Sequence, residues 1–170
     1  MARARKVELD CEASFAVAAA RVVEVRSEEV FAQAEGVLDL GDVERVHDMR
    51  VATRRLRAAL EIFAPAFPRK RHRKALKRVK ALADALGARR DLDVEIELLE
   101  SLTSPGCNAF SPHSGDYALH QGESAALMEL IASLRQRQRR ANDELAPFVA
   151  GKRLKKLRRR LLRLAGEARA

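Results

Sequence analysis

The chain carries apolar residues at spacings of three and four over most of its length, with glycine and proline at the breaks. Residues spaced in this way share one face of a helix, so the pattern predicts amphipathic α-helices. The clearest helix begins after Asp42, a natural N-cap, and ends before Pro65, whose ring cannot continue a helix. Its apolar face consists of Val46, Met49, Leu56, Leu60 and Phe63.

The same pattern predicts further helices at about 7–35, 69–86, 89–102, 123–146 and 152–170. Gly87 is expected to end the helix that starts at residue 69, and Phe67 to anchor the preceding turn in the core. The segment 103–122 is rich in Ser, Gly and Pro, and we expect a flexible loop there. No segment alternates with a period of two, so no sheet is expected. We therefore predict an all-α, antiparallel bundle of about five to six helices.

The predicted domain organisation rests on the length of the chain and on the apolar stripe of its last predicted helix. The 170 residues suffice for one helical domain, placed at 1–150, followed by a basic amphipathic helix at 151–170. The stripe of this last helix consists of Leu154, Leu157, Leu161 and Leu164. Such a stripe needs a surface to cover it, and we interpret it as favouring a homodimer.

The second face of the helix at 42–63 is basic. His47, Arg50, Arg54 and Arg57 recur at spacings of three and four, with apolar residues on both sides of the row. Like charges one turn apart repel each other, so the row lowers stability unless an anion lies against it. A solvated basic face is the simpler alternative, and the apolar flanks argue against it.

The helix predicted from residue 69 has a second basic row. Arg69, Arg73, Lys77 and Lys80 follow one another at spacings of four and three, and Lys70 and Lys74 lie beside them. Cations at a helix N-terminus oppose the helix dipole, which favours an anion at that end. A basic patch that only keeps the protein soluble is the alternative. The argument for binding requires both rows to point into one shared groove.

Together with neighbouring arginines, these rows give the predicted polyanion-binding residues. They are His47, Arg50, Arg54, Arg55, Arg57, Arg69, Arg73, Lys74, Lys77, Lys80, Arg89, Arg90, Arg135 and Arg139. Asp91 and Asp93 are interpreted as structural acids that orient nearby arginines. For His47, a phosphate ligand and a packing residue that orients Arg50 are equally favoured, and a phosphoryl acceptor is not.

The net charge of the chain favours a polyanionic partner but does not identify which one. The formal net charge is +9, and DNA, RNA, an anionic membrane and polyphosphate all remain open on that ground. Aromatic residues make up only 4% of the chain, which disfavours reading of single-stranded bases by stacking.

Two motifs resemble one known family. The run from Val46 to Leu60, VHDMRVATRRLRAAL, is similar to the signature of the CHAD domain, and the run from Leu86 to Val94, LGARRDLDV, to a second motif of that family. The resemblance covers about residues 8–150 and mainly the first of two related helical halves that longer members arrange around a basic channel. It implies an all-helical module that binds inorganic polyphosphate through inward-facing basic residues, without catalysis.

Enzymatic and membrane-spanning functions find little support in the sequence. There is no P-loop, and Glu95-Ile96-Glu97 lies in a predicted helix rather than in the metal-binding strand of triphosphate-tunnel enzymes. Cys11 and Cys107 form no metal motif, so we expect no metal and no cofactor. No apolar run is long enough to span a bilayer, and no signal peptide is recognised. We expect a cytoplasmic protein, associated with polyphosphate granules if the resemblance holds.

Three functions stay open at this point. The first is binding of polyphosphate, the second is binding of nucleic acid by a chromosome-associated helical protein, and the third is attachment to a membrane surface through the last helix. The homodimer would complete the basic channel with a second chain.

Overall fold

A computed structural model describes residues 3–103 and 121–169 of the chain. Its elements are α1 (Phe15–Ala32), α2 (Val43–Ile62), the 3-10 helix η1 (Ala64–Ala66), α3 (Arg69–Thr103), α4 (Gln121–Val149) and α5 (Gly151–Ala168). In these two ranges there is no strand, and the predicted all-α bundle is confirmed. Residues 104–120, most of the predicted loop, lie outside the described part of the chain, whereas Thr103, Gln121 and Gly122 are helical.

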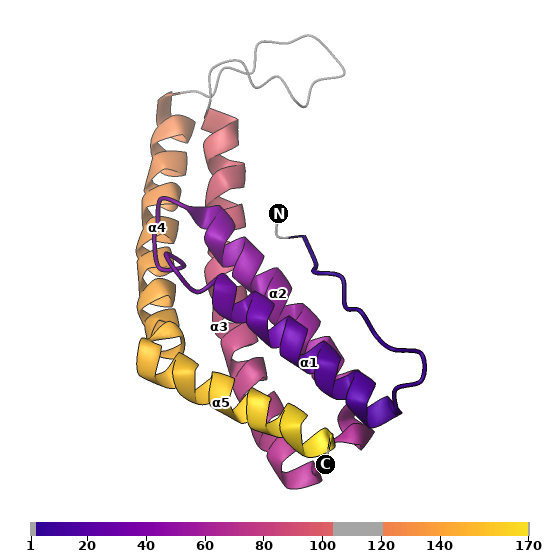
Figure 1. Cartoon of the computed structure of the whole chain (residues 1–170). Helices are drawn as coiled ribbons and strands as arrows, with labels where there is room; N and C mark the ends of the chain where they lie inside the picture. Colours follow the sequence, from indigo (N-terminus) through magenta and orange to yellow (C-terminus); the bar gives the residue numbers. More distant parts are fainter. Residues whose placement is uncertain (1–2, 104–120, 170) are drawn as a thin grey trace.

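One hydrophobic core holds α1, α2, α5 and the first half of α3 together (Figure 1). Val23 from α1, Met49 and Leu56 from α2, Leu82 from α3 and Leu161 from α5 are all almost completely buried in it. Small aliphatic side chains make up most of this core, and they let the helices approach closely. Phe67, just before α3, is also buried in the core, as the sequence predicted.

The helix α3 is continuous, which corrects the prediction of two helices separated at Gly87. Gly87 lies inside the helix, and Gly36 is the glycine with a positive φ in the described ranges. A glycine inside a helix costs about 0.5–1 kcal/mol relative to alanine, and burial of Leu86 and Leu92 on either side outweighs it. The second half of α3 is covered by α4 through a smaller cluster of Leu92, Ile96, Leu134 and Ala141.

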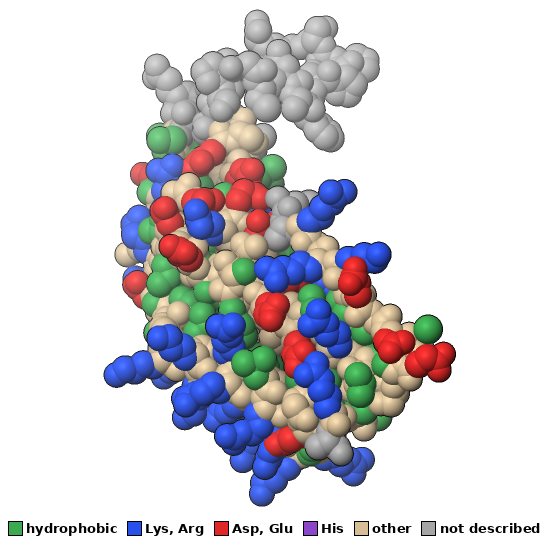
Figure 2. Space-filling model, in the orientation of Figure 1, with side chains coloured by type: hydrophobic (Ala, Val, Ile, Leu, Met, Phe, Trp, Pro, Cys, Tyr) green, Lys and Arg blue, Asp and Glu red, His purple; other side chains and the backbone are tan. Residues whose placement is uncertain are grey.

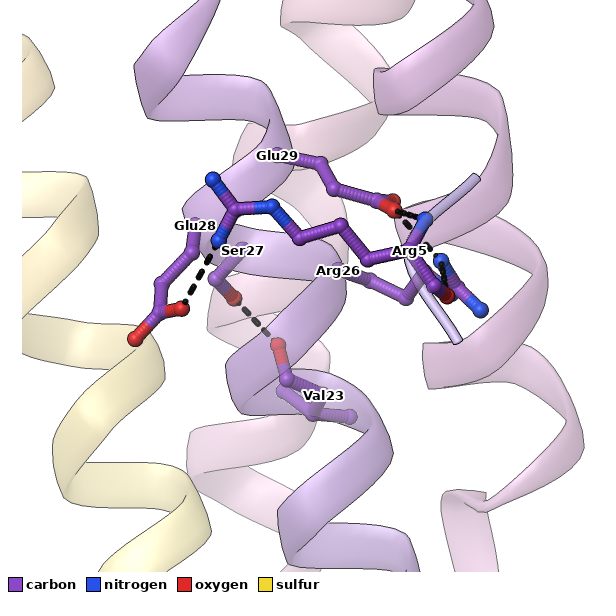
Figure 3. Close-up of polar contacts among 6 residues, drawn as sticks. All are labelled: Arg5, Val23, Arg26, Ser27, Glu28 and Glu29. Carbon is purple, nitrogen blue, oxygen red and sulfur yellow. Dashed lines mark hydrogen bonds and ion pairs between the residues drawn. The ribbon is translucent and has the colours of Figure 1, made fainter. Parts of the chain in front are cut away.

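The first helix begins later than predicted, at Phe15, after an N-cap at Ser14. The preceding segment is extended and is tied to α1 by the side chain of Glu29 (Figure 3). Glu29 Oε1 accepts hydrogen bonds at 2.6 Å from the backbone N–H of Arg5 and from Arg26, which also donates to the Arg5 carbonyl. These bonds compensate one oxygen of an acid that is buried in the bundle, and they tie the N-terminal segment to α1.

The last two helices meet at Ala150. The helix α4 was predicted to end at residue 146, but it includes Pro147 and ends at Val149. The helix α5 begins at Gly151, one residue before its predicted start. The leucines of α5 are buried mainly against α1 within the same chain, and Leu157, Leu161 and Leu164 belong to the main core. The stripe that suggested a homodimer is therefore already covered within the chain, and completion of the basic channel by a second chain stays a prediction.

Candidate functional site

Cations from α2 and α3 converge on one carboxylate at the seam between these two helices. Glu61, in the last turn of α2, presents its Oε1 to Arg57 Nε at 3.2 Å and to Lys80 Nζ at 3.0 Å. Arg57 precedes Glu61 by one turn of α2, whereas Lys80 reaches it from α3. We call the surface around these three side chains the α2–α3 seam.

The basic row of α2 follows this seam. His47, Arg50 and Arg54 precede Arg57 at helical spacings, so they share the face of α2 that holds Glu61. Arg54 is exposed, and His47 and Arg50 are half-buried. On α3, Lys77 is exposed and precedes Lys80 by three residues, which places it on the same side of that helix. Helical spacing therefore places both rows along the α2–α3 seam, and anion binding by them stays a prediction.

The electrostatics of the seam favour an anionic oxygen. Hydrogen bonds from Lys80 and then from Arg57 lower the pKa of Glu61 below its ordinary value, against a small opposing effect of burial. The Glu61 side chain is 41% exposed, so solvent screens these interactions and their contribution to stability is small. The lowered pKa identifies the seam as a place of positive potential.

The start of α3 forms one end of the seam. Here an open hollow of about 940 Å³ is lined by Ala64, Pro65, Phe67, Arg69, Lys70, His72, Arg73 and Leu76. His72 is nearly buried, with its Nε2 2.7 Å from the Leu60 carbonyl oxygen and its ring stacked on Phe67 at 6.0 Å between centroids. These contacts fix the first turn of α3 to the end of α2. Arg69 and Arg73 remain exposed around the hollow.

Two of the predicted binding residues lie away from the seam. Arg55 is half-buried and lines a small cavity of about 60 Å³ with Glu29 and Ala52, on the side of α2 that faces α1. Arg89 is fully buried, at 0% exposure, and forms an ion pair with Asp93. Burial, and then the nearby charge of Arg90, lower the pKa of Arg89. The structure contradicts a direct ligand contact for Arg89, and it agrees with the structural role predicted for Asp93.

The remaining predicted residues are spread along the second half of α3 and along α4. Arg90 is mostly buried and lies 4.0 Å from Glu97. Arg135 forms an ion pair with Glu100 at 2.6 Å, and Arg139 is exposed. This half of the bundle mixes both charges, so these arginines do not extend the seam. The predicted basic residues along the α2–α3 seam are His47, Arg50, Arg54, Arg57, Arg69, Arg73, Lys74, Lys77 and Lys80.

Sequence reasoning missed Glu61 as part of the site. The signal was present, because Glu61 continues the row of His47, Arg50, Arg54 and Arg57 by one further helical step. An acid at the end of a basic row looks like a simple interruption until the neighbouring helix supplies Lys80.

The described residues contain no group of three His, Cys, Asp or Glu side chains placed to hold a metal ion. The Glu95-Ile96-Glu97 pattern lies within α3. Among the helices of the described ranges, none is long and apolar enough to cross a membrane.

The fold and the site together define a class of protein, namely an all-α bundle in which basic rows border one seam between two helices. The family model of the CHAD domain matches residues 21–170, and the chain belongs to this family. The match includes α5, so it extends further toward the C-terminus than the two sequence motifs suggested. Comparison of the chain with curated proteins and with solved structures found no match.

Proposed function

We propose that this protein binds inorganic polyphosphate along the α2–α3 seam, without chemical conversion of the polymer. The observation that carries the proposal is the Glu61 carboxylate, one oxygen of which contacts both Arg57 and Lys80. A phosphate oxygen also accepts charge-assisted hydrogen bonds, so a position that suits a carboxylate oxygen suits a phosphate oxygen too. Family membership supports the proposal, because the CHAD domain is associated with polyphosphate binding in general.

The spacing of the rows suits a linear polymer of phosphates. One helical turn advances about 5.4 Å, so side chains on successive turns can contact successive parts of one chain. Arginine offers paired hydrogen bonds to phosphate oxygens, and lysine adds a mobile point charge. Counterions released from the polymer favour binding, so affinity should fall steeply as salt concentration rises. Binding of this kind would bring the protein to polyphosphate granules in the cytoplasm.

A polyphosphate titration at several salt concentrations tests the proposal. Arg54→Ala and Lys77→Ala remove one exposed cation from each row, and we expect each variant to lose affinity and to lower the salt slope by about one. Arg21→Ala on α1 is the matched control, because Arg21 is also exposed but lies on a helix outside the seam. Equal losses in all three variants would show that net charge, not the seam, determines binding.

Competition with duplex DNA separates the proposal from nucleic-acid binding. Long-chain polyphosphate should release the protein from labelled DNA at a far lower concentration than DNA needs to release it from polyphosphate. The opposite order would refute polyphosphate as the ligand and would favour the nucleic-acid alternative.

A further inference from the structure

The excess positive charge comes from two segments of the sequence that contain no acid. Residues 62–83 hold eight Lys or Arg, and residues 145–166 hold another eight. The two segments contain 16 of the chain's 33 Lys and Arg residues and none of its 24 acids. The rest of the chain therefore has a net charge of −7. The first segment includes the first half of α3, and the second includes most of α5.

The fold brings the two acid-free segments together. The helices α3 and α5 pack in the same core, and Arg71 of α3 forms an ion pair with Glu167 of α5. Glu167 occupies the seam between these helices much as Glu61 occupies the α2–α3 seam. Each flank of α3 therefore already accommodates an anionic oxygen between its own cation and a neighbouring helix.

The exposed face of α3 connects the two flanks. Arg71 and Lys80 are nine residues apart, which at about 100° per residue places them on opposite sides of the helix. Lys70, Lys74 and Lys77 are exposed, and helical spacing places them between these two sides. Cations thus follow one another across α3, with no acid among them, between Glu61 in the α2–α3 seam and Glu167 at the edge of α5.

The side of α5 that faces α3 continues this surface. Lys156, Arg160 and Arg163 precede Glu167 at helical spacings, so they share its face, and with Arg159 they line a hollow of about 210 Å³. Within the described part of the chain, no Lys or Arg between residues 152 and 163 forms an ion pair. Figure 2 shows Lys and Arg side chains gathered over α5 and the adjacent end of the bundle, whereas acids are frequent elsewhere on that face.

We infer that a long phosphate polymer bound at the α2–α3 seam continues across the outer face of α3 and onto the α3-facing side of α5. This inference rests on the proposed function, and it adds a chain-length requirement. Crossing two interhelical distances spans on the order of 16–20 Å, which a triphosphate is too short to cover. Long chains would contact all three helices, and short ones would contact the seam alone.

A membrane surface and a nucleic acid fit the structure of α5 less well as ligands. Insertion into a membrane needs an exposed apolar face, and Leu157, Leu161 and Leu164 are buried in the core. Stacking of nucleic-acid bases uses aromatic side chains, and α5 contains none. A linear anion that needs only charge suits this surface best.

Two matched variants test the path with polymers of different length. Lys156→Gln with Arg163→Gln removes two exposed cations from the α3-facing side, and Lys155→Gln with Arg158→Gln removes the same two residue types from the side nearer α1, where Arg158 lies over Phe31. With long-chain polyphosphate we expect the first variant to bind several-fold more weakly, with a salt slope lower by about two, and the control to bind like wild type. With tripolyphosphate, both variants should bind like wild type.

The remaining outcomes are also decisive. Wild-type affinity of the first variant for the long chain, or equal losses in both variants, would overturn the path over α5 while leaving the seam intact. Loss of binding to vesicles containing phosphatidylserine, with unchanged binding of long-chain polyphosphate, would assign the surface to a membrane and refute the inference. If wild-type protein binds neither polymer, the proposed function itself fails. Circular dichroism of each variant confirms that the helices are retained.

Discussion

Glu61 is an anion placed inside a cationic seam. Its carboxylate partly neutralises Arg57 and Lys80, which are the side chains best placed to meet a phosphate from two helices at once. An incoming polymer must therefore compete with a carboxylate attached to the protein. If the proposed function holds, the residue lowers the affinity of the seam for polyphosphate and orients its cations in the absence of ligand.

Replacing Glu61 by glutamine should strengthen polyphosphate binding. Glu61→Gln removes the competing charge and keeps the side-chain size, so we expect several-fold tighter binding and a steeper salt dependence. Glu44→Gln is the control, because Glu44 is an exposed acid at the opposite end of α2. Isothermal titration of both variants measures the effect. Weaker binding of Glu61→Gln would mean that Glu61 organises the seam more than it opposes the ligand.

The pH dependence of stability follows from the lowered pKa of Glu61. Because the pKa is lower in the folded protein, the ion pairs stabilise the fold above the ordinary pKa of 4.5, and that contribution is lost as the pH falls through the folded value. For an exposed pair we expect wild type to exceed Glu61→Gln by less than about 1 kcal/mol at pH 7, with a smaller difference near pH 3. Urea unfolding at both pH values measures this. A difference that grows toward low pH would contradict the assignment.

At the level of the helices, a buried ion pair within α3 is linked to α4 by a hydrogen bond. Arg89 and Asp93 lie one turn apart in α3 and are fully buried, and Gln138 of α4 donates a hydrogen bond to Asp93 Oδ1 at 2.6 Å. Arg89 Nε and Nη2 have no hydrogen-bond partner in the described part of the chain, so Asp93 is the main compensation for a buried charge. This polar cluster lies where the long helix α3 passes from the main core to its contact with α4.

Removing Asp93 should therefore destabilise the bundle strongly. We expect Asp93→Ala to cost about 3–5 kcal/mol, because it leaves the Arg89 guanidinium buried without a counter-charge. Asp91→Ala, an exposed acid two positions away, should change stability by less than about 0.5 kcal/mol. Arg89→Met combined with Asp93→Leu should be less destabilising than Asp93→Ala alone. Thermal unfolding compares the three variants, and similar melting temperatures for both single variants would contradict this role.

The sequence predicted the helices better than their contacts. The spacing of three and four located α2 and the stripe of α5, because burial of one helix face imposes that spacing whatever covers it. The same spacing does not say what covers the face, so the α5 stripe was assigned to a second chain although α1 covers it. Gly87 was taken as a helix end because its preference for turns is local, whereas the packing that keeps α3 continuous comes from distant segments.

The candidate site shows the same limit. The row on α2 was predictable, because four basic residues on one helical face depend only on sequence spacing. The exclusion of Arg55 and Arg89 was not, because a helix has several charged faces and the neighbouring helices decide which are buried. The part played by Glu61 required the position of Lys80, which α3 supplies from a different part of the chain.

For the whole molecule, the arrangement of charge matters more than its sum. The net charge of +9 hides a strongly basic pair of segments attached to an otherwise acidic chain. Such a distribution orients the molecule in the field of a polyanion before contact, and it accelerates association at low salt. Two variants with the same net charge should therefore associate at different rates.

The comparison uses Lys70→Gln with Lys74→Gln on the exposed face of α3, against Arg21→Gln with Arg137→Gln on α1 and α4. Both variants lose two exposed cations, but only the first loses them from an acid-free segment. We expect stopped-flow association with long-chain polyphosphate to be slower for the first variant at low salt, because steering depends on where the charge lies. Near 1 M salt the screening length falls to about 3 Å, so the two rates should converge. Equal rates at low salt would mean that the polymer responds to the total charge of the protein, and that the clustering of cations on α3 and α5 has no part in its capture.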